Sequence, residues 1–179
     1  DVLVFGAGPN GIILAQLLQH SNAGRVVSLA PTKFKLDLLN SYGIETIQID
    51  QAAPEKHVKE VFARFPYGVD AIVDATGSAS VLPGCFRLLK KRGRLLQFSS
   101  TKDDEDITIN PAYFYRNELH YYTCAWQVHQ FGAALEAMAS GKVKLDRLVT
   151  KQYPLEEFPQ AIEDVLDRNV LKLVIRPNG

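Results

Sequence analysis

The stretch that decides the fold is Asp1 to Leu18, DVLVFGAGPNGIILAQLL. Residues 2–5 form a short apolar run with the character of a strand, and the glycine-rich segment GAGPNG follows at once. The apolar residues after this segment have the spacing of a helix that packs on a sheet. The stretch therefore contains G-x-G-x-x-G in the order strand, turn, helix, which predicts a dinucleotide-binding site.

Each glycine of this motif has a physical role. Gly6 allows a tight turn out of the strand, Gly8 leaves no Cβ between the backbone and a pyrophosphate, and Gly11 lets the helix lie close to the strand. Pro9 suits the first helical turn, where its missing N–H costs nothing. The free N–H groups and the positive end of this helix then face the anion. We therefore include Pro9 and Asn10 with the three glycines as candidate cofactor-binding residues.

Composition excludes several classes of function. The 179 residues are 46% hydrophobic, with 20 basic and 20 acidic residues, so the charge gives no support for binding to nucleic acid or to an anionic membrane. No apolar run approaches the roughly 20 residues of a membrane span. Cys85 and Cys124 lie far apart and outside any C-x-x-C pattern, which favours a reducing, cytoplasmic location and argues against a structural zinc. Both are predicted to be small buried residues.

Strand-like and helix-like segments alternate after the first helix. We predict strands at 25–29, 44–49, 69–75, 93–98 and 118–125, and helices ending near residue 42 and at 54–65, 79–91 and 127–140. Residues 101–117, with an acidic run and an aromatic cluster, are predicted to be a loop. This alternation predicts an α/β fold with a doubly wound, parallel six-stranded sheet of the Rossmann type. Gly6, Ala30, Thr76 and Ser99 would meet beyond the carboxyl ends of its strands, where ligands of such sheets bind.

The end of the second predicted strand indicates the choice of cofactor. An acidic residue there would hold the adenine ribose hydroxyls and repel a 2′-phosphate. Here the strand ends at Ala30, and Thr32, Lys33 and Lys35 follow. A hydroxyl and two lysines without an acid favour NADP over NAD. The alternative is that both lysines belong to the solvated face of the next helix. Asp37 is the nearest acid, but we expect it to lie one turn inside that helix and to point away from the strand end.

No residue of the chain is assigned a catalytic role. The four histidines, His20, His57, His120 and His129, show no metal-binding spacing. The chain also lacks a G-x-S-x-G nucleophile motif and a P-loop. We therefore predict no metal site within this sequence.

The pattern of predicted strands and helices changes near residue 148. Residues 1–147 are predicted to be the dinucleotide-binding domain, and residues 148–179 add a short strand, helix and strand. Such an appendage after a complete six-stranded sheet is typical of a segment that returns to another domain. The sequence also begins inside a strand, so we expect it to be part of a longer polypeptide.

Four blocks of the sequence resemble the medium-chain dehydrogenase/reductase family, the zinc alcohol and polyol dehydrogenases. The blocks are GAGPNG, VDAIVDATGS, LLKKRGRLLQFS and the segment ASGKVKLDRLVTKQYPLEEFPQAIEDVLDRNVLKLVIRP. In this family, a coenzyme domain and a C-terminal return segment accompany an N-terminal catalytic domain of roughly 150 residues. That domain carries the zinc ligands and the proton relay. The resemblance implies that zinc binds only there, because no residue here matches those ligands.

The resemblance also implies roles for individual residues. Gly6, Gly8 and Gly11 match the pyrophosphate turn of the family. Ala30 falls where NAD-specific members carry Asp, Thr32 falls near a phosphate-binding Arg of NADP-dependent members, and Lys35 matches a basic residue that flanks the adenosine ribose. Thr76, Gly77 and Ser99 fall where the family's backbone lines the nicotinamide channel. Two pairs depart from the common pattern, namely Ser99-Ser100 and Thr123-Cys124.

The function implied is the cofactor-binding part of an NADP(H)-dependent alcohol or polyol dehydrogenase, similar to arabinitol or sorbitol dehydrogenases. The resemblance further implies a homodimer or homotetramer that pairs the edge strand at 118–125, beside Tyr121, Tyr122 and Trp126. A non-catalytic NADP(H)-binding module is the alternative. A methyltransferase is a more remote alternative, since that class usually has an acidic residue where Ala30 stands.

Overall fold

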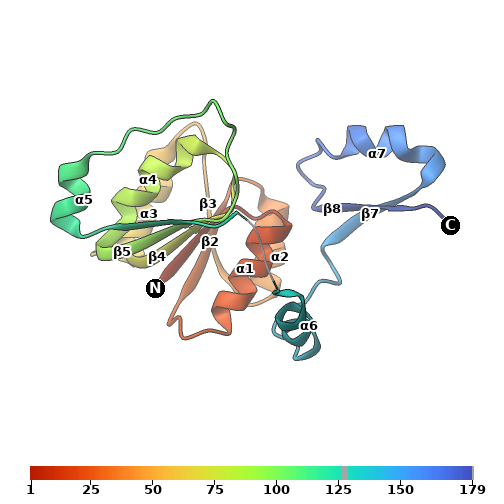
Figure 1. Cartoon of the computed structure of the whole chain (residues 1–179), viewed down its shortest axis with the longest axis horizontal. Coiled ribbons are helices and arrows are strands. Elements are labelled where there is room, and N and C mark those ends of the chain that lie inside the picture. The colour runs from red at the N-terminus through yellow and green to blue at the C-terminus, as the bar shows by residue number, and fades with distance from the viewer. Residues whose placement is uncertain (126–128, 179) are drawn as a thin grey trace.

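The computed structural model describes residues 1–125 and 129–178 and shows a Rossmann-type sheet with a small C-terminal unit (Figure 1). Six parallel strands form the sheet in the order β3-β2-β1-β4-β5-β6. They are β1 (Val2–Phe5), β2 (Val26–Ala30), β3 (Glu45–Gln48), β4 (Val69–Asp74), β5 (Leu89–Gln97) and β6 (His120–Thr123). The predicted fold class is confirmed. None of the helices in the described ranges has the length and apolar character needed to cross a bilayer.

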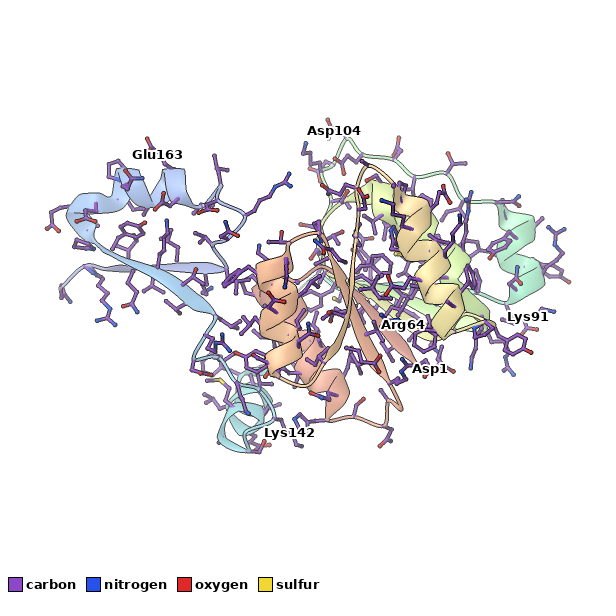
Figure 2. The ribbon with its side chains drawn as sticks, turned by 180° about the vertical axis from the view of Figure 1, so that it is seen from behind. Asp1, Arg64, Lys91, Asp104, Lys142 and Glu163 are labelled. Carbon is purple, nitrogen blue, oxygen red and sulfur yellow. The ribbon has the colours of Figure 1, made fainter. Side chains whose placement is uncertain are left out.

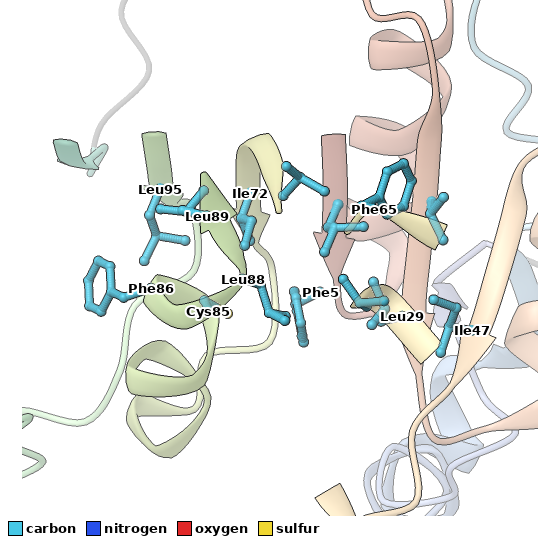
Figure 3. Packing of buried hydrophobic residues seen from close by; sticks show 14 of the residues in the cluster. Phe5, Leu29, Ile47, Phe65, Ile72, Cys85, Phe86, Leu88, Leu89 and Leu95 are labelled. Carbon is cyan, nitrogen blue, oxygen red and sulfur yellow. The ribbon is translucent and has the colours of Figure 1, made fainter. Parts of the chain in front are cut away.

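Helices cover both faces of this sheet. They are α1 (Pro9–Gln19), α2 (Lys33–Ser41), α3 (Pro54–Arg64), α4 (Leu82–Leu88) and α5 (Pro111–Asn117). One apolar core lies under α3 and α4, where Phe5, Ile72 and Leu95 meet Cys85 (Figure 3). A second core lies under α1 and α2 and contains Val4, Ile12 and Leu39. Because both faces are covered, β1 and β2 are buried along their whole length, and Ser28 is the one polar residue of these two strands.

Two predicted segments differ from the structure. Residues 111–117 are a helix where a loop was expected, because Pro111 occupies the first helical position and the Asn110 side chain accepts a hydrogen bond of 3.1 Å from the Tyr113 N–H. The helix expected at 79–91 is shorter. A 3-10 turn (Ala79–Val81) leads into α4, and β5 already begins at Leu89, which pairs with Val69 of β4.

The remaining elements follow the sheet. They are α6 (Phe131–Ala139), β7 (Val149–Pro154), a 3-10 turn (Leu155–Glu157), α7 (Phe158–Asp164) and β8 (Lys172–Arg176). The first two positions of the helix expected at 127–140, as well as Trp126, lie outside the described residues. Strands β7 and β8 pair in parallel as a separate two-stranded sheet, which stands apart from the main sheet in Figures 1 and 2.

A buried glutamine joins the C-terminal part of the chain to α1. The Gln16 side chain is 3% exposed, donates to the Lys144 carbonyl at 3.2 Å and accepts from the Lys144 N–H at 2.8 Å. Arg147 donates to the Ser41 hydroxyl at 2.9 Å, and Leu148 and Leu171 pack in the core beneath α1 and α2. The segment that leads to β7 is thus fixed to the same helices that follow β1 and β2.

The first prediction compares two glycines of one motif. A Cβ added at Gly11 would lie 2.0 Å from the Gly6 carbonyl oxygen, whereas a Cβ at Gly8 meets no atom within 4 Å. We expect Gly11→Ala to lower the free energy of unfolding by about 1–3 kcal/mol or more, because backbone must move to admit the methyl group. Gly8→Ala should cost less than about 1 kcal/mol, the difference between two N-cap residues. Urea denaturation followed by circular dichroism measures both, and equal losses would contradict this account of the turn.

Candidate nucleotide-binding site

The predicted site residues gather at the carboxyl edge of the sheet. Phe5 lies beside Leu29 of β2 and Asp74 of β4, and Asp74 lies beside Gln97 of β5. The four strands therefore end level with one another. Ala30, the last residue of β2, lies along this edge together with Gly6, Thr76 and Ser99, which follow the other three strands.

The glycine turn leaves one approach open. Gly6 has a φ of +100°, and a Cβ there would lie 2.8 Å from the Ala75 carbonyl oxygen. The turn is thus pressed against the end of β4 on one side and against Gly11 of α1 on another. Only Gly8, of the three motif glycines, has open space where its side chain would be. A ligand can therefore approach the backbone at Gly8 without meeting a side chain there.

The start of α1 suits an anion. Gly8 is its N-cap with extended backbone, no side chain caps the helix, and its first turn carries no acidic residue. The N–H groups of a first turn have no partner within the helix, and the helix dipole is positive at this end. Asn10 can donate from its backbone, but Pro9 cannot, because proline has no N–H. Pro9 instead fixes the backbone at the first helical position.

The residues after β2 present cations that are already partly engaged. Ala30 is 2% exposed and places no charge at the strand end. Thr32 is the N-cap of α2, but its hydroxyl makes no capping hydrogen bond. The Lys33 ammonium donates to both oxygens of the Asp37 carboxylate at 2.7 Å. Asp37 therefore points back along α2 toward Lys33, as a residue one turn inside the helix can.

Lys35 lies in a different environment from Lys33. Burial lowers the pKa of the Lys35 ammonium, and the Asp167 carboxylate opposes this effect. Asp167 follows α7, so the C-terminal unit contributes negative charge near α2. The two lysines proposed from the sequence are thus not equivalent: one is exposed and paired within its helix, and the other is half-buried.

An open cleft of about 640 Å³ lies between the start of α1 and the ends of β5 and β6. Asn10 and Ser99 line it, as does the pair Thr123-Cys124 that departs from the family pattern. Thr76 and Gly77 are not among its lining residues. Cys124 is exposed, so its prediction as a buried residue was wrong, while Cys85 is buried as predicted. The residues that sequence reasoning did not assign to the site are Gln97, Phe98, Ser100, Thr123, Cys124 and Ala125.

A second cleft of about 570 Å³ lies beyond the ends of β2 and β3. Pro31, Gln48 and Asp50 line it together with Lys56, whose ammonium lies 2.7 Å from the Asp50 carboxylate. The Gln48 side chain donates to the Pro31 carbonyl at 3.0 Å and so holds the chain that leaves β2. Sequence reasoning missed this cleft because its residues follow β3, which carries no recognised motif.

Asp74 is a buried acid that sequence reasoning did not select. It is 0% exposed at the end of β4, and its Oδ1 accepts from the Thr76 N–H at 3.0 Å and the Thr76 hydroxyl at 2.6 Å. Burial raises the pKa of the Asp74 carboxyl, while these hydrogen bonds act in the opposite direction. An acid that directly follows the apolar residues AIV at the carboxyl end of this strand is the feature that could have identified it.

Over the described ranges, the structure holds no group of three or more His, Cys, Asp or Glu side chains that could bind a metal ion. The site is thus built from backbone, hydroxyls, amides and a few lysines. These are groups that bind phosphates and sugar hydroxyls.

Known proteins are similar to this chain in sequence and in fold. The family model for zinc-binding dehydrogenase matches residues 9–140. D-arabinitol dehydrogenase 1 of Uromyces fabae is 30% identical over 180 residues, which cover 99% of this chain and 52% of that protein. The chain thus spans about half the length of the curated relatives that it matches.

Solved structures agree in fold. A protein of Sinorhizobium meliloti 1021, assigned as a zinc-binding dehydrogenase and bound to NADP, superposes with a TM-score of 0.88 at 22% identity, over 99% of this chain and 52% of that one. An alcohol dehydrogenase of E. coli CFT073 complexed with NADH gives 0.85 at 22% identity, over 97% and 51%. With a family model matched over most of its length, the chain belongs to the zinc-binding dehydrogenases of the medium-chain dehydrogenase/reductase family.

Proposed function

We propose that this chain is the cofactor-binding part of an oxidoreductase that transfers a hydride between NADP(H) and an alcohol or polyol. The observation that carries the proposal is the glycine turn, where the open side of Gly8 faces outward at the uncapped, acid-free start of α1. The polyol substrate class is inferred from the D-arabinitol and sorbitol dehydrogenases among the relatives.

The residues present fit a nicotinamide dinucleotide. Gly8, Asn10 and Gly11 would hold the pyrophosphate through backbone and helix dipole. The nicotinamide half would be held by Thr76, Gly77 and Ser99 and by the cleft that Asn10 lines. Ala30, Thr32, Lys33 and Lys35 would flank the adenosine ribose. The bound cofactor supplies hydride chemistry, while these residues supply orientation and electrostatics.

The preference for NADP(H) is a proposal about charge. Ala30 removes the acid that would accept from both ribose hydroxyls and repel a 2′-phosphate. The Thr32 hydroxyl is not used as a helix cap and can donate to a phosphate. The Lys33 ammonium already pairs with the Asp37 carboxylate at an exposed site. Lys33 would therefore contribute to NADP(H) binding by exchanging this carboxylate for the 2′-phosphate. Structures with NADP and with NADH both occur among the structural neighbours, so the fold itself permits either cofactor.

The second prediction concerns the ratio of the affinities for NADP(H) and NAD(H). We expect NADP(H) to bind at least about tenfold more tightly than NAD(H), equivalent to about 1.4 kcal/mol. Ala30→Asp should reverse much of this preference, and Lys33→Ala should weaken NADPH and leave NADH nearly unchanged. Asp37→Asn is the matched variant, because it frees Lys33 and should tighten NADPH alone. Fluorescence titration with both cofactors measures this, and equal or tighter NADH binding by the unmodified chain would refute the preference.

We propose that residues 148–179 pack against a catalytic domain outside this sequence, while residues 1–147 form the dinucleotide-binding domain. The support is exposed apolar surface within residues 148–179. Leu166 is 84% exposed after α7. Phe158 and Ile162 of α7 are exposed as well. Apolar surface of this extent is typical of an interface with another domain.

The third prediction concerns turnover. We expect the 179-residue chain to bind NADPH and to show no dehydrogenase activity with alcohols or polyols, with or without added zinc. The reason is that no residue here matches the zinc ligands or proton relay of the family. The measurement is NADPH absorbance at high protein concentration. Steady turnover by this chain would contradict the proposal that the catalytic groups lie in another domain. Cofactor binding without turnover in a full-length protein would instead favour the alternative of a non-catalytic NADP(H)-binding module.

We also propose a two-fold dimer through β6. This strand is an edge of the main sheet, and Tyr122 in it is 48% exposed. An unpaired edge strand presents N–H and C=O groups for strand addition, and a two-fold axis satisfies both copies at once. Trp126, which was also expected beside this edge, lies outside the described residues.

The fourth prediction tests that dimer. Sedimentation equilibrium should give a dimer at tens of micromolar protein, an order of magnitude at which a specific edge pairing is populated. Tyr122→Lys should shift the equilibrium toward monomer, because charge on an edge strand opposes pairing. Tyr67→Lys is the matched control, since Tyr67 is an exposed tyrosine that lies before β4. A monomeric unmodified chain would contradict the proposal.

A further inference from the structure

We propose that Asp74 is a positioning residue for the nicotinamide half of the cofactor, because it joins the two loops that would hold that half. The first loop is residues 76–78 after β4, and the second is residues 98–100 after β5. This inference rests on the proposed function, since it assumes that the carboxyl edge of the sheet binds a nicotinamide dinucleotide. It concerns a residue that is buried and that does not itself touch the ligand.

The side chain of Asp74 fixes the first loop. Its Oδ1 accepts from both the N–H and the hydroxyl of Thr76, at 3.0 Å and 2.6 Å. The Thr76 hydroxyl oxygen in turn accepts from the Ser78 N–H at 3.2 Å. One carboxylate oxygen therefore determines the direction of the Thr76 side chain, and through it the path of the chain as far as Ser78.

The backbone of Asp74 fixes the second loop. Its carbonyl oxygen accepts from the Phe98 N–H at 2.8 Å and from the Ser99 N–H at 3.3 Å. The Gln97 side chain adds a hydrogen bond of 3.1 Å to the Ser99 carbonyl. Ser99 is thus held on both its N–H and its carbonyl, at the wall of the larger cleft.

The two loops also touch each other. Gly77 has a φ of +71°, and a Cβ there would lie 3.0 Å from the Ser100 carbonyl oxygen. A change in the Thr76 turn therefore moves Gly77 against the second loop. Asp74 thus hydrogen-bonds to both loops, to the first through its side chain and to the second through its carbonyl.

A carboxylate in this position is costly, which points to a specific role. Asp74 is fully buried, and its Oδ2 has no hydrogen-bond partner among the described residues. The neighbouring ionisable groups are the buried Cys85 thiol on α4 and the Tyr121 hydroxyl on β6, and neither is a cation. The Tyr121 hydroxyl is engaged by the Gln97 side chain. A buried polar group with an unpaired atom destabilises a fold, so what it fixes must outweigh that cost.

The test compares the affinity for the whole cofactor with the affinity for its adenosine half alone. The probes are NADP⁺ and 2′,5′-ADP, titrated calorimetrically into the 179-residue chain. Asp74→Ala should weaken NADP⁺ by at least about tenfold, the effect of about 1.4 kcal/mol, and change 2′,5′-ADP by less than about twofold. Asp74→Asn keeps an oxygen that can accept from Thr76 and should retain most of the NADP⁺ affinity.

A second variant keeps the test valid if Asp74→Ala does not fold. Thr76→Val removes the hydroxyl that Asp74 holds and should give the same split between the two probes. Ser80→Ala is the control, because Ser80 is an exposed hydroxyl residue in the 3-10 turn after the first loop, and its hydroxyl pairs with Ser78 and not with Asp74. Equal losses for both probes would show a merely structural role and overturn the inference. If the unmodified chain binds neither probe, the proposed function itself fails.

Discussion

The contact on which this structure depends is the approach of α1 to the turn after β1. The Cα of Gly11 lies so close to the Gly6 carbonyl that no side chain fits between them. This contact fixes the direction in which the helix leaves the sheet. The uncapped N–H groups of its first turn consequently face the same edge at which β2, β4 and β5 end. The places proposed for the pyrophosphate and the ribose, and the larger cleft, all lie at this edge.

The motif and the alternating pattern predicted this part of the molecule well, because both report local geometry. A glycine with positive φ, an apolar parallel strand and a helix with a buried stripe leave direct marks in sequence. The helix at residues 111–117 was missed because an acidic run and clustered aromatics outweighed the short capping signature of Asn110 and Pro111. The hydrogen bond from the Tyr113 N–H to the Asn110 side chain closes its first turn, and composition does not reveal such a bond.

The side-chain partners at the site were harder to predict, because they depend on distances in the folded chain. Lys33 and Lys35 are similar in sequence, yet one pairs with Asp37 on its own helix and the other is half-buried near Asp167. The role proposed for Asp74 also depends on tertiary structure, since the N–H groups that its carbonyl accepts from belong to the loop after β5. Periodicity identifies which face a residue occupies, but it does not identify the atom that the side chain meets.

Helix α1 is attached at two points along its length, and this limits changes in the length of the helix. Gly11 is pressed against the turn at one end, and Gln16 clamps the Lys144 backbone further along. With a rise of about 1.5 Å and a rotation of roughly 100° per residue, an inserted or deleted residue between these points would turn one contact away from its partner. The number of residues between Gly11 and Gln16 is therefore fixed by two contacts that lie on different elements. The exposed connection from α1 to β2 carries no such constraint.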